Sequence, residues 1–324
     1  MVNWIGIGIV AGLAAVTLQA AILYPSPLTA LLFYLSALPV FVAGLGWGVN
    51  AAALAGLSGG LAMAAAGSLK ASLIFLISTA LPPSILSWLA LRSRPADGPA
   101  SEGEAEAQGV QWYPEGRLVL WAAAMAGGAT ALMLVMVGPD PETFRATLQA
   151  AVKDLLVAIA PQNEQLEQAQ LDRLAGLLAV VLPMAGASVW LIATLANLKI
   201  GAALLAAAGR AARPWSRFGA LAFPRRATWL LPVALVVSFL PGAIGFLGSV
   251  FAAALFTAFA LLGLAVLHGL TEGVAARPFL LGGLYLALVL LNWVLVVPLA
   301  MLGLLDTAFA IRARAAPSPP ANRT

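Results

Sequence analysis

Four polar side chains are the first candidates for chemistry, because each lies at the end of an apolar run or inside one. His268, the only histidine, closes an apolar stretch and is followed by Glu272 in a short polar segment. Asn50 begins another run, and Asn292 lies inside the last one. A buried asparagine can bind a ligand or hydrogen-bond a neighbouring helix. His268 and Glu272 line a cavity mouth or simply mark the membrane boundary. We name all four as candidate ligand-binding residues and leave both interpretations open.

The sequence also excludes several kinds of site. With no cysteine and one histidine, thiolate catalysis, iron–sulfur clusters and multi-histidine metal sites are ruled out. The interiors of the apolar runs contain no Asp, Glu, Lys or Arg, which disfavours a proton relay or a voltage sensor. The P-loop pattern for ATP is absent. We therefore expect that the chain is not an enzyme and holds no cofactor or metal. Active transport would need energy from a partner, or from Na⁺ held by uncharged oxygens.

Glycine spacing gives a second set of candidates. Gly8 and Gly12 are four residues apart in the first apolar run, and Gly56 and Gly60 repeat this spacing in the third. Such spacing lets two helix backbones approach closely. The glycines would dock a partner subunit, or pack helices within this chain.

One pair of opposite charges follows the last apolar run. Asp306 and Arg312 are six residues apart, whereas a direct pair on one helix needs a spacing of three or four. We therefore interpret both as charges that mark the membrane edge.

Composition defines the fold class. The 324 residues are 62% hydrophobic and only 9% charged, with a mean hydropathy of +0.96, whereas a soluble domain carries about 25% charged residues. The apolar runs do not alternate with polar residues, so they predict helices rather than barrel strands. We expect an all-α, polytopic transmembrane helical bundle with eight or nine spans. The expected spans are 4–23, 28–44, 47–67, 71–91, 117–138, 174–198, 227–241, 243–270 and 279–305.

Polar segments divide the chain. The segment 92–116 is rich in Pro, Gly, Ala and Glu and is expected to be a disordered, acidic, cytoplasmic linker. Residues near 141–160 place apolar side chains on one helical face, which predicts an external amphipathic helix. The expected parts are a four-helix N-terminal half (1–91), the linker (92–116), a C-terminal membrane half (117–305) with a basic cytoplasmic loop (199–227), and a polar tail (306–324).

Basic residues predict the orientation. Loops 92–117 and 199–227 carry most of the arginines, so the positive-inside rule places both loops, and the N-terminus, in the cytoplasm. Nine spans would leave the C-terminus outside, although Arg312, Arg314 and Arg323 favour the inside. Either the short segment 227–241 does not cross, or the last stretch, broken by Pro298, folds back. The first helix lacks a preceding positive charge and is expected to be retained rather than cleaved. The basic loop is a candidate for anionic lipid head groups rather than for nucleic acid.

Two stretches resemble known families. Residues 35–61, LSALPVFVAGLGWGVNAAALAGLSGGL, resemble the second and third helices of the substrate-binding S components of energy-coupling-factor vitamin transporters. Residues 303–315, GLLDTAFAIRARA, together with LAVLHGL at 264–270, resemble the YybS-like family of uncharacterised bacterial membrane proteins. The first resemblance implies a small ligand bound in the membrane and separate ATPase subunits, although this chain has more than their six helices. The second implies a multi-pass protein of the bacterial cytoplasmic (inner) membrane.

Two functions follow as hypotheses. The chain is transporter-like, binding a small molecule between helices and using a partner for energy. Alternatively, it is a non-catalytic scaffold or assembly factor that contacts a membrane protein partner through its small-residue faces and its basic loop.

Overall fold

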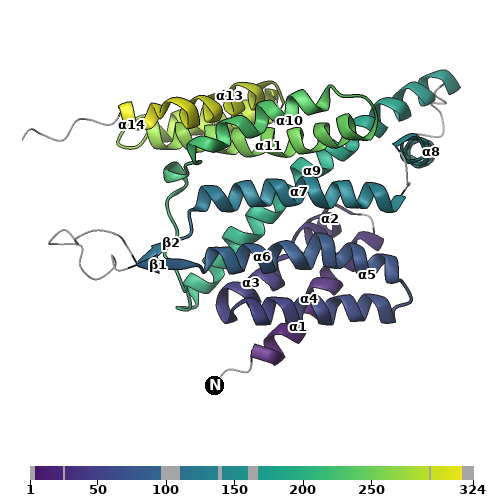
Figure 1. The fold of residues 1–324 in the computed structure, drawn as a ribbon, viewed down its shortest axis with the longest axis horizontal. Helices are drawn as coiled ribbons and strands as arrows, with labels where there is room; N and C mark the ends of the chain where they lie inside the picture. The colour runs from purple at the N-terminus through teal and green to yellow at the C-terminus, as the bar shows by residue number, and fades with distance from the viewer. Residues whose placement is uncertain are drawn as a thin grey trace, which may run out of the picture.

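The chain folds as an all-α bundle with one short β-ribbon (Figure 1). The computed structural model describes residues 4–24, 26–95, 110–137, 141–159, 167–291 and 293–315. Apolar runs fold as helices because a helix satisfies its own backbone hydrogen bonds, which hydrocarbon cannot do. The helices are α1 (Trp4–Ala20), α2 (Pro27–Tyr34), α3 (Leu38–Trp47), α4 (Val49–Ala65), α5 (Leu69–Phe75), α6 (Leu81–Ala90), α7 (Glu115–Val137), α8 (Pro141–Ile159), α9 (Gln168–Ala207), α10 (Leu230–Ser238), α11 (Gly242–Leu270), α12 (Arg277–Leu291), α13 (Trp293–Phe309) and α14 (Ile311–Ala315). The shorter elements are the 3₁₀ turns η1 (Ala21–Leu23), η3 (Phe218–Ala220) and η4 (Arg225–Trp229), the π-helical turn η2 (Leu76–Ala80), and the strands β1 (Ser93–Pro95) and β2 (Val110–Trp112).

Six helical segments in the described part of the chain are long and apolar enough to cross a membrane. The prediction of an all-α protein with several spans is confirmed at this level. Three further apolar helices, α4, α12 and α13, are shorter, at 10–17 residues. The six long segments are Trp4–Leu23, Pro27–Trp47, Leu69–Ala90, Glu115–Met133, Gln168–Ala207 and Gly242–Leu270.

The structure divides the last expected span, 279–305, into two helices. At Gly263, a Cβ would collide with the backbone of Leu299 on α13, and Gly269 lies next to Arg312, just beyond α13. Both helices therefore run in the same direction, and α12 must carry the chain back between them. A fold-back of this stretch was one of the two alternatives left open by the sequence, with the break at Pro298. The chain reverses between α12 and α13 instead, and Pro298 lies inside α13.

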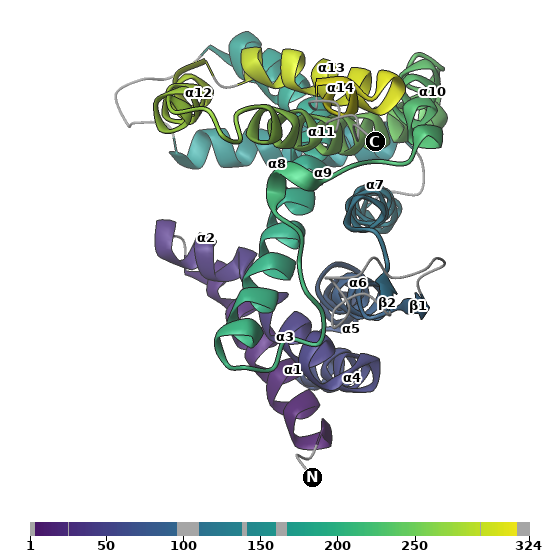
Figure 2. The same cartoon turned by 90° about the vertical axis from the view of Figure 1, so that its left-hand side faces the viewer.

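Helix α9 connects the two halves of the bundle. Its 40 residues span about 60 Å at the usual rise of a helix. It packs against α3 on one side and against α7 and α11 on the other, and Figure 2 shows it running from the α10–α13 group to the α1–α6 group. Its side chains Leu191 and Leu198 belong to one buried apolar cluster with Phe41 and Phe259. A smaller cluster forms between α1, α3 and α4.

The expected glycine contacts occur within this chain. A Cβ on Gly8 would lie 2.9 Å from the carbonyl oxygen of Ala51, and one on Gly12 would collide with Ala55 and Ser58. Helices α1 and α4 therefore run in parallel with their backbones in close contact, as small residues allow in membranes.

The second glycine pair packs α4 against the following helices. A Cβ on Gly56 would lie 3.0 Å from the side chain of Ala80, and one on Gly60 would lie 3.0 Å from Leu76. Both glycines are buried, so their faces are covered by the chain itself.

The basic residues outside the helices gather at one end of the bundle. This end, which we call the basic end, carries the β-ribbon, the 208–229 loop and α14. The guanidinium of Arg312 donates to the carbonyl oxygens of Gly219 (2.6 Å) and Leu221 (2.7 Å), which ties α14 to the loop. Helix α8 lies at the opposite end, seen end-on in Figure 1. The last described helix therefore lies on the same side as the basic loop, which removes the conflict created by counting nine spans.

The expected linker is described only at its two ends. Ser93–Pro95 pairs antiparallel with Val110–Trp112, and residues 96–109 lie outside the described part. The ribbon therefore brings the end of α6 next to the start of α7.

Substituting Gly12 should destabilise the fold strongly. Gly12→Leu places a side chain where α4 backbone already lies, and overpacking of this kind costs about 1–3 kcal/mol. Gly6→Leu is the matched control, since a Cβ at Gly6 meets nothing within 4 Å. Thermal unfolding of both variants in detergent micelles measures the difference. Equal melting temperatures would contradict the α1–α4 contact.

Cysteine labelling tests the arrangement of the ends, because the chain has no natural cysteine. Ala211→Cys in the basic loop and Ala313→Cys in α14 should react with an impermeant reagent from the same side. Ala66→Cys, at the far end of α4, should react from the other side. Labelling of positions 211 and 313 from opposite sides would show that the path of α12 and α13 is wrong.

Candidate functional site

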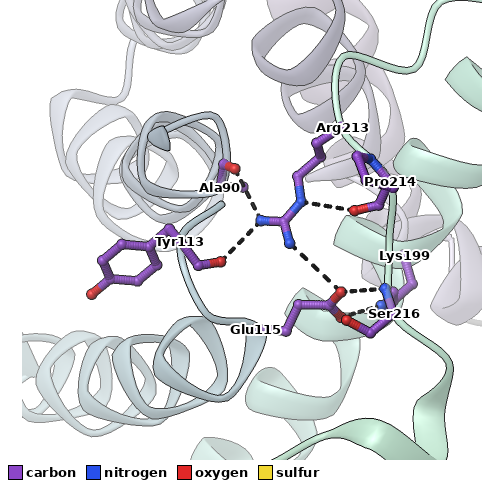
Figure 3. Close-up of polar contacts among 7 residues, drawn as sticks. All are labelled: Ala90, Tyr113, Glu115, Lys199, Arg213, Pro214 and Ser216. Carbon is purple, nitrogen blue, oxygen red and sulfur yellow. Dashed lines mark hydrogen bonds and ion pairs between the residues drawn. The ribbon is translucent and has the colours of Figure 1, made fainter. Parts of the chain in front are cut away.

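Arg213 lies at the centre of the polar contacts of the basic end (Figure 3). Its side chain is only 6% exposed. Its guanidinium donates to the carbonyl oxygens of Ala90 (3.0 Å), Tyr113 (3.1 Å) and Pro214 (3.3 Å). Ala90 ends α6, so its carbonyl lacks a helical partner, and a buried cation is well suited to satisfy it.

Glu115 balances this buried charge. It begins α7 and accepts hydrogen bonds from the ammonium group of Lys199 (2.6 Å) and from the backbone N–H of Ser216 (2.6 Å). Arg213 lies 3.7 Å from the same carboxylate. We call Glu115, Lys199, Arg213 and Ser216 the clasp. It joins α6, α7, the end of α9 and the 208–229 loop, which are far apart in the sequence.

Aromatic rings enclose the clasp cations. The guanidinium of Arg213 lies 4.5 Å from the ring centre of Trp215, and the ammonium of Lys199 lies 4.6 Å from the same ring. Burial lowers the pKa of Arg213, and the charge of Glu115 opposes this shift. Because an arginine pKa starts so high, the side chain remains charged at neutral pH. The clasp is therefore a charged, well-satisfied structural unit rather than a proton donor.

A cavity of about 680 Å³ opens beside the clasp, between α11, α13 and the 208–229 loop. We call it the α11–α13 cavity. Its polar lining comes from Arg225, Glu272, Asp306, Thr307 and Arg312. This volume is within the range of small-molecule sites.

Asp306 and Arg312 form an ion pair in the wall of this cavity. Both guanidinium Nε and Nη2 of Arg312 contact one carboxylate oxygen of Asp306, at 3.1 and 2.8 Å. The sequence spacing of six argued against a direct pair, and that interpretation was wrong. The chain turns at Ala310, whose φ of 52° ends α13, so α14 brings Arg312 back over Asp306. Nothing in the sequence marks Ala310 as left-handed, because glycine or asparagine usually occupies such a position.

Two opposite charges in the cavity have no ion-pair partner among the described residues. Glu272 and Arg225 are both exposed, and neither takes part in the ion pairs found there. Arg225 makes only a long contact, 3.5 Å, to the carbonyl oxygen of Ala308. The cavity thus offers one free carboxylate and one free guanidinium, with its other two charges already paired.

The four residues expected to bind a ligand do not come together. Glu272 lines the cavity. His268 lies one turn away, and its ring is engaged: Nδ1 donates to the carbonyl oxygen of Leu264 (2.9 Å), which leaves Nε2 to accept from the Tyr285 hydroxyl (3.1 Å). Asn50 is exposed at the start of α4, and Asn292 lies outside the described residues.

Sequence reasoning missed Arg225 and the clasp. Glu115 and Lys199 are 84 residues apart, so no local pattern connects them. The one sequence signal for the clasp was the position of Glu115, immediately before the apolar run at 117–138. The described residues contain no group of three or more His, Asp or Glu that could hold a metal.

Removing the central arginine should open the clasp. Arg213→Met leaves Glu115 and three carbonyl groups partly unsatisfied, and breaking a buried ion pair costs about 3–5 kcal/mol. Lys153→Met is the control, because its ion pair with Asp172 joins α8 to α9 at an exposed position and should contribute about 1 kcal/mol or less. Denaturant unfolding in micelles measures both. Similar losses in the two variants would contradict a structural role specific to Arg213.

One family comparison matches more than half of the chain. Residues 118–307 match the model described as a predicted membrane protein, DUF2232. The match begins in the first turn of α7, ends within α13 and includes the cavity residues Arg225, Glu272 and Asp306. No curated protein and no solved structure matches the chain. The chain therefore belongs to the DUF2232 family of membrane proteins.

Proposed function

We propose that this chain is a transporter-like membrane protein that binds a small zwitterionic molecule in the α11–α13 cavity. The observation that carries the proposal is the pair of free opposite charges, Arg225 and Glu272, in a wall where Asp306 and Arg312 neutralise each other. A carboxylate or phosphate on the ligand would pair with Arg225, and an ammonium group with Glu272. Charge-assisted hydrogen bonds of this kind are short and strong.

The energy source would be a partner. The chain has no P-loop and no ionisable residue inside its expected spans, so uptake would depend on separate ATPase subunits, as in the S components that residues 35–61 resemble. The cavity lies at the basic end, so it would act as the cytoplasmic site of binding or release. We expect no catalytic role, no cofactor and no metal.

The alternative, a scaffold or assembly factor, has weaker support. Its main argument was a set of small-residue faces available for docking, and Gly8, Gly12, Gly56 and Gly60 make contacts within the chain. The basic loop remains free to meet anionic head groups or a partner, because Arg217 and Arg226 are exposed. Pull-down from native membranes separates the two functions: an ATPase pair supports transport, and an assembly complex supports the scaffold.

We also propose a topology. The three shorter apolar helices, and the η4–α10 segment, would cross the bilayer together with the six long segments. This gives one crossing more than the nine expected at most, because the span 279–305 is two helices. The N-terminus and α14 would then both be cytoplasmic, in the inner membrane of a bacterium, as the YybS-like resemblance implies.

Ligand-induced thermal stabilisation tests the proposed chemistry. Purified protein should be stabilised by zwitterions, such as free amino acids and betaines, and not by dicarboxylates or diamines. Glu272→Gln and Arg225→Gln should each weaken binding at least tenfold, since each removes one charge-assisted contact worth about 1.5–3 kcal/mol. Asp154→Asn, an exposed change on α8, is the control.

Two outcomes would contradict the proposal. One is stabilisation by dicarboxylates that survives Arg225→Gln. The other is the absence of stabilisation by any zwitterion in the panel.

A further inference from the structure

A second cavity at the basic end has a different charge. It has a volume of about 720 Å³ and lies between the end of α6, the β-ribbon and the first turn of α7. We call it the ribbon cavity. Its charged lining residues are Arg92, Arg94 and Arg117, and no acidic residue belongs to the described lining.

Two of these arginines contact neutral neighbours in the described part of the chain. The guanidinium of Arg92 lies 4.0 Å above the ring centre of Trp88. Nε of Arg94 donates to the side-chain oxygen of Gln111 across the ribbon (2.7 Å). Both contacts are with neutral groups. All three arginines are exposed, and within the described part of the chain none of them takes part in an ion pair.

Among the described residues, the acid closest in sequence to these arginines, Glu115, already has its own partners. Glu115 lies two residues before Arg117, but its carboxylate faces the clasp and is shared by Lys199, Ser216 and Arg213. Arg213 itself lies behind the cavity wall, 5.8 Å from the ring centre of Trp112. Among the described residues, the clasp thus engages the Glu115 carboxylate and adds the positive charge of Arg213 behind the ribbon cavity.

Two exposed tryptophans beside the cavity support a position at the level of lipid phosphates. Trp88 on α6 and Trp121 on α7 are 42% and 48% exposed, as expected for an interfacial aromatic belt. The indole N–H of Trp121 donates to the hydroxyl of Tyr113 at 3.1 Å, and Tyr113 lines the cavity. The arginines lie beyond these rings along both helices. Acyl chains alongside α6 and α7 would therefore bring a head group to the cavity.

We propose that the ribbon cavity is a phosphate-binding site that takes the head group of an anionic phospholipid from the leaflet at the basic end. Arginine suits this ligand because its planar fork donates two parallel hydrogen bonds to phosphate. Basic pockets between transmembrane helices bind such head groups in the same way. The site is separate from the α11–α13 cavity, whose charges balance, and it does not depend on the function proposed for that cavity.

The test compares binding of three soluble probes to the full chain in detergent. They are dihexanoyl phosphatidylglycerol, its zwitterionic phosphatidylcholine counterpart, and glycerol 3-phosphate. The variant Arg92→Gln/Arg94→Gln/Arg117→Gln should bind phosphatidylglycerol at least tenfold more weakly. Arg173→Gln/Arg277→Gln/Arg314→Gln is the matched control, since it removes the same charge from positions outside the ribbon cavity and the basic loop and should change affinity less than threefold.

Each outcome has a defined meaning. Preference for phosphatidylglycerol that is lost only in the ribbon variant supports the proposal. Equal losses in the two triple variants would show general surface attraction and overturn it. Tight binding of glycerol 3-phosphate without any lipid preference would overturn the lipid assignment. If the ribbon triple variant melts early, Arg117→Gln alone provides the comparison, with an expected loss of at least threefold.

Discussion

Hydrocarbon cannot form hydrogen bonds, and this constraint governs where the charged groups of the described helices lie. Inside the bundle, helices satisfy their own backbones and pack through small residues, as at Gly12 and Gly263. Charged side chains are displaced to the ends, where loops leave carbonyl groups without helical partners. Side chains at the basic end therefore have two roles. They hydrogen-bond carbonyl groups that lack helical partners, and they hold segments that are distant in the sequence in one arrangement.

Arg213 and Arg312 fill both roles in the same way. Arg213 donates to the last carbonyl of α6 and to the chain beyond the ribbon, and Arg312 donates to two carbonyls of the 208–229 loop. Each is also matched by one carboxylate, the partly buried Glu115 or the buried Asp306. A lysine could not replace either arginine, because only the guanidinium fork reaches several acceptors in fixed directions. The shape of both cavities depends on these two fixed points.

Much of the helical framework could be predicted from the sequence, and the site could not. The run at 4–23 corresponds to Trp4–Leu23, and the run at 243–270 corresponds to Gly242–Leu270, because apolar length directly reflects membrane thickness. A reversal in the last stretch was one of two alternatives, but its position was predicted at Pro298, whereas the chain reverses between α12 and α13. The Asp306–Arg312 pair was missed because it depends on one left-handed residue, Ala310. The clasp depends on tertiary contacts between segments about 100 residues apart.

Of the two cavities, the α11–α13 cavity has most of its charged residues inside the family-matched region, whereas the arginines of the ribbon cavity lie outside it. Residues 118–307 contain Arg225, Glu272 and Asp306, so a binding role common to the family would reside in the charge-balanced α11–α13 cavity. Arg92, Arg94 and Arg117 all precede the matched region, so the ribbon cavity belongs to the part of this chain outside it. Screening by salt acts mainly on uncompensated exposed charge. A ligand of the ribbon cavity should therefore respond to ionic strength far more than a zwitterion in the α11–α13 cavity, and this difference distinguishes the two sites within a single molecule.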